Sequence, residues 1–116
     1  MAYVDGFLVP VRTGEREAYR KMATEAAAVY KEHGATAVVE AWGDDVPEGK
    51  VTSFPMAVKL EPGETVVFSW VLWPSREARD AGNAKVMADP RMQPPAEMPF
   101  SPQRMIFGGF TPIVEV

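Results

Sequence analysis

Four stretches of the chain are rich in β-branched and aromatic residues, and together they predict four strands. They cover residues 3–11, 35–42, 64–73 and 104–112. The stretch 64–73 is apolar almost without interruption, which is typical of a strand inside a sheet rather than at its edge. Residues 44–63 are rich in Asp, Pro and Gly, so we expect turns there and at most a short hairpin strand near residues 53–60.

Two segments between these strands repeat apolar residues at steps of three and four, which predicts amphipathic helices. The first is expected between Thr13, a typical N-cap residue, and Gly34, a typical residue just beyond a helix C-terminus. Its predicted buried stripe is Tyr19, Met22, Ala23, Ala26, Val29, Tyr30 and His33. The second is expected over residues 75–88, with Ser75 as its cap and Pro90 just beyond its end. Its predicted buried stripe is made of the small residues Ala78, Ala81, Gly82 and Ala88.

The resulting order is strand, helix, strand, strand, helix, strand. With a length of 116 residues, this order predicts a single α+β domain over residues 1–116. We expect a ferredoxin-like βαββαβ fold, in which one antiparallel sheet carries both helices on the same face. Right-handed crossovers leave few other arrangements for this order.

Alternation along the strands divides their residues into two sets, one for each face of the sheet. The small and aliphatic set suits a position beneath the helices. The other set, which the helices would leave uncovered, is Tyr3, Asp5, Phe7, Val9, Val38, Glu40, Trp42, Asp44, Val66, Phe68, Trp70, Leu72, Arg104, Ile106, Gly108 and Phe110. Most of these residues are apolar, and such a face is larger than the apolar patches of ordinary monomers. We therefore expect an identical subunit to cover it, which gives a homodimeric α+β barrel.

The candidate site lies on this second set of residues. The candidate ligand-binding residues are Tyr3, Asp5, Glu40, Trp42, Trp70 and Arg104. The aromatic side chains would stack on a small aromatic or apolar molecule in a cleft, and the charged side chains would orient it. Burial of an unpaired charge is costly, so the charged groups need partners. In the alternative interpretation, Arg104 pairs with a carboxylate across the strands or across the dimer and fixes the register.

Composition and motifs narrow the chemistry further. The chain has no cysteine and one histidine, His33, which excludes thiolate nucleophiles and zinc sites built from Cys and His. The net charge of −4 argues against a nucleic-acid partner, and no apolar run is long enough to span a membrane. Phosphate-binding loops, dinucleotide fingerprints and nucleophile elbows are absent from the sequence, so we expect no cofactor. We interpret the acidic residues 44–48 as a solvated turn rather than a metal site, and we expect a soluble cytoplasmic domain without a signal peptide.

Several blocks of the sequence, in the same order, resemble one bacterial family. The blocks are Tyr3-Val4-Asp5-Gly6-Phe7, Val38-Val39-Glu40, Trp42-Gly43-Asp44-Asp45-Val46-Pro47, Val67-Phe68-Ser69-Trp70, Asp89-Pro90-Arg91-Met92, Arg104-Met105-Ile106 and Gly108-Gly109-Phe110. They are similar to domain of unknown function 1428, the YbaA-like proteins. The resemblance implies a ferredoxin-like dimeric α+β barrel without an established biochemical function. It also implies a cysteine where this chain has Ala41, so a thiol-based role does not carry over.

Three hypotheses for the function follow. In the first, a homodimeric barrel binds a small aromatic or apolar molecule. In the second, the protein is a cofactor-independent monooxygenase-like enzyme that uses a carboxylate in the cleft to remove a substrate proton. The chain resembles such monooxygenases in architecture alone. In the third, the protein is a structural or regulatory dimer whose two sheet faces fill each other completely. A cavity at the sheet face would favour the first two hypotheses over the third, and a carboxylate beside it would favour the second.

Overall fold

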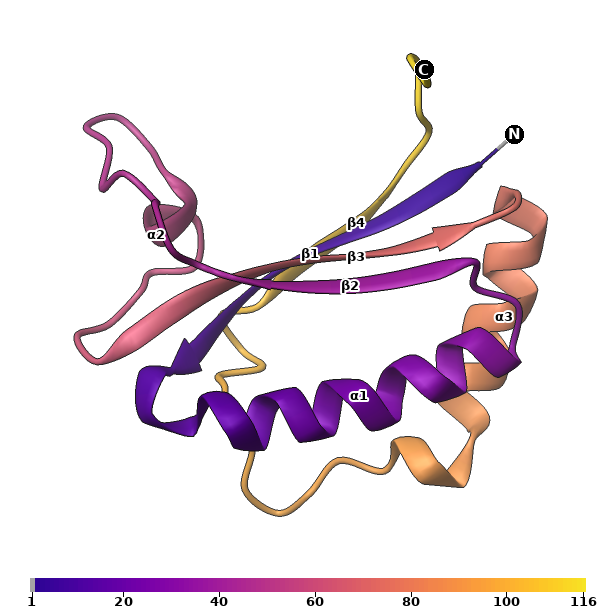
Figure 1. Ribbon diagram of the computed structural model, residues 1–116, viewed down its shortest axis with the longest axis horizontal. Helices are drawn as coiled ribbons and strands as arrows, with labels where there is room; N and C mark the ends of the chain where they lie inside the picture. The colour runs from indigo at the N-terminus through magenta and orange to yellow at the C-terminus, as the bar shows by residue number, and fades with distance from the viewer. Residues whose placement is uncertain (1) are drawn as a thin grey trace.

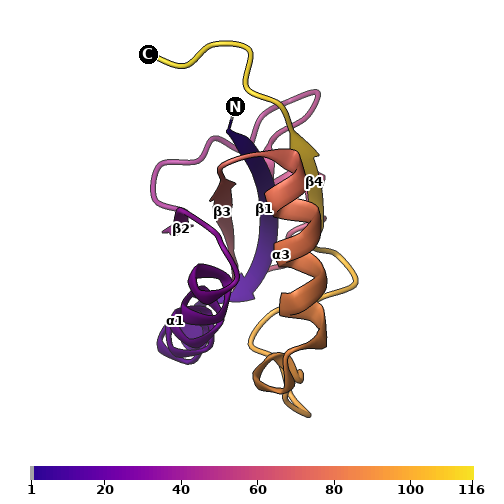
Figure 2. The same cartoon turned by 90° about the vertical axis from the view of Figure 1, so that its right-hand side faces the viewer.

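The computed structural model describes residues 2–116, which form one antiparallel sheet with the long helices on one side of it (Figure 1). The strands are β1 (Tyr3–Arg12), β2 (Ala37–Trp42), β3 (Glu64–Trp73) and β4 (Ile106–Phe110), in the sheet order β2-β3-β1-β4. The helices α1 (Arg16–Glu32) and α3 (Arg76–Ala88) lie on the same face of this sheet (Figure 2). The predicted α+β class, the βαββαβ order and the interior position of residues 64–73 are confirmed. None of the helices described for residues 2–116 combines the length and apolar character that a membrane span requires.

The helix ends show which local signals the chain uses. The Ser75 hydroxyl oxygen accepts a hydrogen bond from the Ala78 backbone N–H at 3.0 Å, so the predicted cap of α3 is confirmed. Gly34 follows α1 with a φ of +111°, a conformation that favours glycine. Thr13 does not cap α1, because a 3-10 turn over Thr13–Glu15 precedes the helix. The Thr13 hydroxyl instead lies 2.7 Å from the Thr65 hydroxyl.

The segment 43–63 contains a short helix, α2 (Phe54–Ala57), so the hairpin strand considered near residues 53–60 is wrong. Ser53 caps this turn by accepting a hydrogen bond from the Met56 backbone N–H at 3.1 Å. Pro55 favours the first turn of a helix, where its missing N–H leaves no partner unsatisfied. The segment rises on the side of the sheet away from α1 and α3 (Figure 1).

The cross-strand register overturns part of the predicted face assignment. Phe7 pairs with Ser69, which pairs with Glu40, so these three residues lie on one face. Ser69 and Val71 are buried on the face that the helices cover. The residues wrongly placed on the uncovered face are Tyr3, Asp5, Phe7, Val9, Val38, Glu40 and Trp42. The residues of β3 and β4 were assigned to the correct faces. The predicted alternation of β1 and β2 is therefore shifted by one residue relative to that of β3.

The core lies between the helices and the covered face of the sheet. Its fully buried apolar side chains form two groups: Val9, Val11, Tyr19, Ala23 and Val67, and Tyr3, Ala35, Val71 and Trp73. Trp73 has no exposed surface, and Gly82 of α3 lies directly against its ring. Of the small-residue stripe predicted for α3, Gly82 is buried while Ala81 and Ala88 are exposed. α3 therefore lies close to the sheet at Gly82 because that position has no side chain.

Replacement of Gly82 with alanine should destabilise the fold by roughly 1–3 kcal/mol through overpacking. A Cβ atom at this position would lie 2.4 Å from the Trp73 ring and 2.5 Å from the His33 carbonyl oxygen. Gly14→Ala is the matched control, because a Cβ atom there meets nothing within 4 Å. Urea denaturation of both variants measures the effect, and equal midpoints would contradict the close packing at Trp73.

Candidate functional site

Apart from the pair Arg12 and Glu64 at one end of β1 and β3, the face of the sheet opposite α1 and α3 is apolar at every strand position that the structure describes. We call it the uncovered face, and its residues are Val4, Gly6, Leu8, Pro10, Ala37, Val39, Ala41, Val66, Phe68, Trp70, Leu72, Ile106, Gly108 and Phe110. Several large side chains are open to solvent: Phe68 is 47% exposed, Ile106 44% and Phe110 60%. A solvent-facing sheet surface normally alternates polar residues with the core residues beneath it. This face does not, so its composition is that of an interface.

The total surface of the chain is also larger than a monomer of this size needs. The accessible surface is 7746 Å², whereas a folded monomer of this mass exposes about 6,300 Å². The excess of roughly 1,400 Å² is greater than the ~800 Å² that each partner contributes to a standard interface. The molecule measures 38 × 37 × 21 Å, as expected for two layers with one open side.

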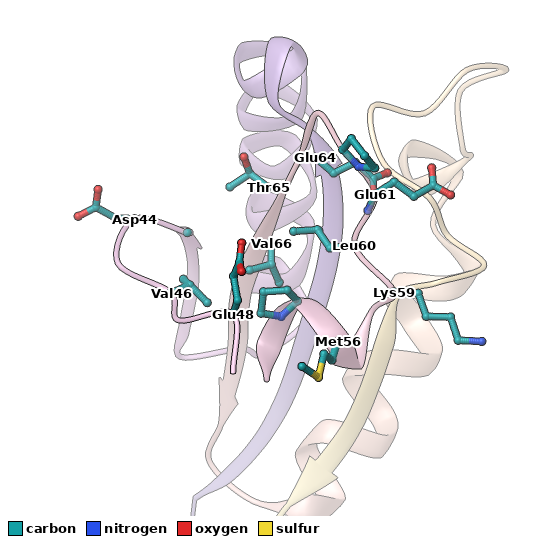
Figure 3. Close-up of a pocket in the computed structure, with 13 residues that line it drawn as sticks. Asp44, Val46, Glu48, Met56, Lys59, Leu60, Glu61, Glu64, Thr65 and Val66 are labelled. Carbon is teal, nitrogen blue, oxygen red and sulfur yellow. The ribbon is translucent and has the colours of Figure 1, made fainter. Parts of the chain in front are cut away.

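The uncovered face carries an aromatic cluster and an adjoining groove. The ring centroids of Phe68 and Trp70 are 5.3 Å apart, and those of Phe54 and Phe68 are 6.0 Å apart. A groove of about 660 Å³ opens beneath residues 43–63, which we call the α2 segment, at the end of the face where β3 begins (Figure 3). Its lining residues are Gly43, Asp44, Val46, Glu48, Pro55, Met56, Lys59, Leu60, Glu61, Pro62, Glu64, Thr65 and Val66. Its volume lies within the range of small-molecule sites.

The groove has apolar walls and a mostly acidic rim. Asp44, Lys59 and Glu61 point outward at its edge, while Val46 and Leu60 lie toward its middle (Figure 3). Lys59 is the one cation in the lining. The surplus of carboxylates lowers the electrostatic potential of the groove and disfavours an anionic ligand.

Arg104 lies beside this groove and holds its end of the sheet together. Its guanidinium donates to both carboxylate oxygens of Glu64, at 2.6 and 2.8 Å, and to the backbone carbonyls of Val58 and Lys59. The hydrogen bond from Arg104 lowers the pKa of the Glu64 carboxyl. Arg104 lies in the turn before β4, so the strand predicted to begin at residue 104 begins only at Ile106. Arg104 has the carboxylate partner that the alternative interpretation expected, but the pair does not join two neighbouring strands; it ties the α2 segment to β3.

Asp5 lies on the helix-covered face and is fully paired. Its carboxylate accepts hydrogen bonds from the Arg79 guanidinium at 2.8 and 3.1 Å and from the Trp73 ring N–H at 3.0 Å. Its side chain is 11% exposed and that of Arg79 is 22% exposed. A carboxylate that receives two guanidinium donors and an indole donor is held as a structural ion pair. Asp5 fastens β1 and β3 to α3.

Tyr3 lies in the same cluster, beneath the cationic side chains of α3. Its ring centroid is 5.1 Å from the guanidinium carbon of Arg79 and 6.0 Å from that of Arg76. Gly109 faces this cluster, and a Cβ atom there would lie 2.4 Å from the Tyr3 hydroxyl. The lack of a side chain at Gly109 therefore allows β4 to approach Tyr3 and Arg79 closely.

Glu40 and Trp42 contact α1 rather than the uncovered face. The Tyr19 hydroxyl donates to Glu40 Oε1 at 2.7 Å. Partial burial raises the pKa of the Glu40 carboxyl, against the lowering effect of the Tyr19 and Ser69 hydroxyls. The guanidinium of Arg16 lies over the Trp42 ring at 5.3 Å. Both residues therefore help to fasten α1 to β2.

The predicted cleft of six residues is consequently wrong as a single site. Of its members, Trp70 lies on the uncovered face and Arg104 lies at the end of that face, whereas Tyr3, Asp5, Glu40 and Trp42 lie beneath the helices. The prediction missed Arg79, the partner of Asp5. A signal was present, because Arg79 precedes Gly82 by three residues and Val86 by seven and so falls on the buried stripe of α3.

The single histidine has a packing role at the ends of the two long helices. His33 Nε2 lies 3.1 Å from Asp89 Oδ2, and Arg91 bridges Asp89 at 2.7 Å and Glu32 at 2.5 Å. The Arg91 side chain and backbone N–H, which both donate to Asp89, hold the pKa of that carboxyl well below its usual value. Within residues 2–116, no three His, Asp or Glu side chains gather in a way that could hold a metal ion.

The fold and its surface define a two-layer α+β protein with an unshielded apolar sheet face. Residues 2–102 match the family model described as Protein of unknown function (DUF1428). The chain is 56% identical over 116 residues to the "Uncharacterized protein YbaA" of Escherichia coli K12 and of Shigella flexneri, with 99% of each chain covered. The chain therefore belongs to the DUF1428 family. Among solved structures it is similar to Rv0793 from Mycobacterium tuberculosis, with a TM-score of 0.49, 15% identity and coverage of 99% of this chain and 98% of that chain.

Replacement of Arg79 with methionine should leave the Asp5 carboxylate without its cation and destabilise the fold. The expected loss is roughly 2–4 kcal/mol, near the lower end for a broken buried pair because Arg79 retains some exposure. Arg76→Met is the matched control, since Arg76 also lies over Tyr3 but its side chain is 69% exposed. Urea denaturation at neutral pH compares the two, and similar losses would contradict the role of the Asp5 pair.

Replacement of Arg104 with methionine should make the stability less sensitive to acid. The pair with Arg104 lowers the pKa of Glu64 in the folded chain below its ordinary value of 4.5. At a pH between the lowered and the ordinary pKa, the unfolded chain therefore binds more protons at Glu64 than the folded chain does. The pair thus stabilises the fold fully above the ordinary pKa. This stabilisation is lost as the pH falls through the lowered pKa. Urea denaturation across the acid range should show a destabilisation of R104M that shrinks as the pH falls. Lys59→Met is the control, and a pH-independent loss in R104M would contradict this linkage.

Proposed function

We propose that the protein is a homodimer whose two uncovered faces pack against each other and enclose a site for a small aromatic or apolar molecule. The observation that carries the proposal is the composition of the uncovered face, which is apolar at every strand position except Arg12 and Glu64 at one end. An identical subunit is the simplest cover, because two copies of the same apolar face match each other in size and character. This arrangement corresponds to the dimeric α+β barrel expected from the sequence.

The energetics of the exposed surface support this assembly. Burial of ~800 Å² per subunit is typical of a stable interface, and the surface excess of the chain is greater than that. At ~25 cal/mol per Å² of apolar surface, such an interface outweighs the usual costs of association. The edge strands β2 and β4 are also available to meet the partner, because neither has a neighbour on its outer side.

The aromatic cluster and the groove support a ligand site within the interface. Trp70 and Phe68 offer ring faces on which a planar apolar molecule could stack. The groove beneath α2 offers space near the start of β3, where Val66 lines it two residues before Phe68. Its acidic rim favours a neutral or cationic molecule over an anionic one. The proposed ligand is therefore a small aromatic or apolar molecule without a negative charge.

The enzymatic alternative has lost the observation on which it depended. It required a carboxylate in the cleft, but Asp5 is buried on the helix-covered face and paired with Arg79. Glu40 lies on that same face at the edge strand β2, where it is exposed and accepts a hydrogen bond from Tyr19. The carboxylates of the groove rim, apart from Glu64, are exposed. A binding protein therefore fits the geometry better than a carboxylate-dependent catalyst.

Replacement of Phe68 with glutamate should convert the dimer into monomers, because it places an unpaired charge in the middle of the apolar interface. Phe107→Glu is the matched control, since Phe107 is also an exposed strand phenylalanine but pairs with Phe7 on the opposite face. Native mass spectrometry of protein purified gently from cells reports subunit number and any retained small molecule together. We expect a ligand-bearing dimer for the wild type and F107E, and a monomer without ligand for F68E.

Two results would contradict the proposal. A wild type that stays monomeric at high concentration would remove the dimer. A dimer that forms but retains no molecule, and whose interface leaves no cavity, would favour the structural or regulatory dimer instead.

A further inference from the structure

The last six residues of the chain form an apolar segment that contacts little of their own subunit. Residues 111–116, which we call the arm, include Ile113, Val114 and Val116. These three residues are almost entirely open to solvent, with relative accessible surfaces of 95%, 76% and 123%. Within residues 2–116, none of the backbone hydrogen bonds outside the helices and strands involves the arm. The arm also contains Pro112 and the charged Glu115. Its three exposed β-branched apolar side chains are costly in water, so a surface outside the subunit is the natural partner.

The direction of the arm shows where this surface must lie. The arm leaves the end of β4 and rises on the side of the sheet away from α1 and α3 (Figure 1). Seen along the sheet, it also crosses from the β4 side toward the β2 side (Figure 2). The arm therefore projects into the space that a second subunit on the uncovered face would occupy.

We propose that the arm of each subunit pairs, as an added strand, with the outer edge of β2 in the other subunit. This inference rests on the homodimer proposed above. Strand addition uses the unpaired backbone N–H and C=O groups of an edge, and apolar side chains beside that edge give it specificity. The arm would then close the seam of the barrel, so that each ligand site is completed by residues of the other chain.

The outer edge of β2 is the better of the two available edges. β2 has the sequence Ala-Val-Val-Glu-Ala-Trp, which contains no proline or glycine and is as long as the arm. β4 is shorter and contains Gly108 and Gly109, which weaken a strand as a template for pairing. On β2, Val39 is 36% exposed on the uncovered face. Alternate residues of an added strand share a face, so Val114 and Val116 would together extend this apolar surface.

Deletion of residues 112–116 tests the contribution of the arm to the dimer. We expect the dissociation constant, measured by sedimentation equilibrium, to rise about tenfold or more because the buried apolar surface of the arm is lost. Met87→Ser is the control, because Met87 is a 64% exposed apolar residue that lies on α3, away from the uncovered face. In hydrogen exchange of the full-length dimer, the β2 amides that do not pair with β3 should be protected, and this protection should be lost in the truncated dimer at a concentration that keeps it associated.

Engineered cysteines test the position of the arm directly, since the natural chain has no cysteine that could react. One chain carries Val114→Cys and a differently tagged chain carries Val39→Cys. A short bismaleimide should join them into a covalent heterodimer. The control pairs Val114→Cys with Ala28→Cys, an exposed position on α1, and should give little product.

The outcomes separate this inference from the dimer itself. A full-length chain that is monomeric overturns both proposals. A dimer whose dissociation constant and β2 protection do not change on truncation overturns the arm alone. Cross-linking of Val114→Cys to the control position at the same rate as to Val39→Cys also overturns it, because the arm would then have no fixed place on the partner.

Discussion

Two helices can cover only one face of a four-stranded sheet, and in this chain the other face is apolar except for the pair Arg12 and Glu64 at one end. The rest of the structure is arranged around that constraint. α1 and α3 use one face for the core around Trp73, while the α2 segment and the arm rise on the opposite side (Figure 1). The apolar face therefore lies between segments of its own chain and remains open at its centre, as expected for a surface that a second subunit completes.

The polar groups inside the protein belong to the helix–sheet interface. Asp5 with Arg79 and Glu40 with Tyr19 each join a strand to a helix, and no buried side-chain nitrogen or oxygen among residues 2–116 lacks a partner. Such pairs contribute mainly by fixing one arrangement of helices on the sheet, because their desolvation offsets much of their attraction. The polar pairs between the helices and the sheet thus fix the fold. The apolar outer face supplies the proposed assembly and ligand site.

The candidate site could be predicted only in part. Phe68 and Trp70 were assigned correctly, because the large aromatic side chains of β3 alternate with smaller side chains that suit a position beneath the helices. Asp5 and Glu40 were misplaced, because the small and aliphatic set of alternate residues in β1 and β2 was assigned to the helices, whereas the other set lies there. The groove could not be predicted at all. It depends on the path of residues 43–63, which Ser53, Pro55 and the bonds from Arg104 determine together.

The sequence by itself determined the elements, their order and the apolar excess of the strands, because these depend on local periodicity and turn chemistry. It also determined the family. Only the tertiary structure decided which set of alternate residues in β1 and β2 faces the helices. The physical reason is that alternation has a period of two residues, so a strand shifted by one residue exchanges its faces without changing its pattern. Both sets in β1 are largely apolar, and only pairing with β3 and the contact of Asp5 with Arg79 distinguish them.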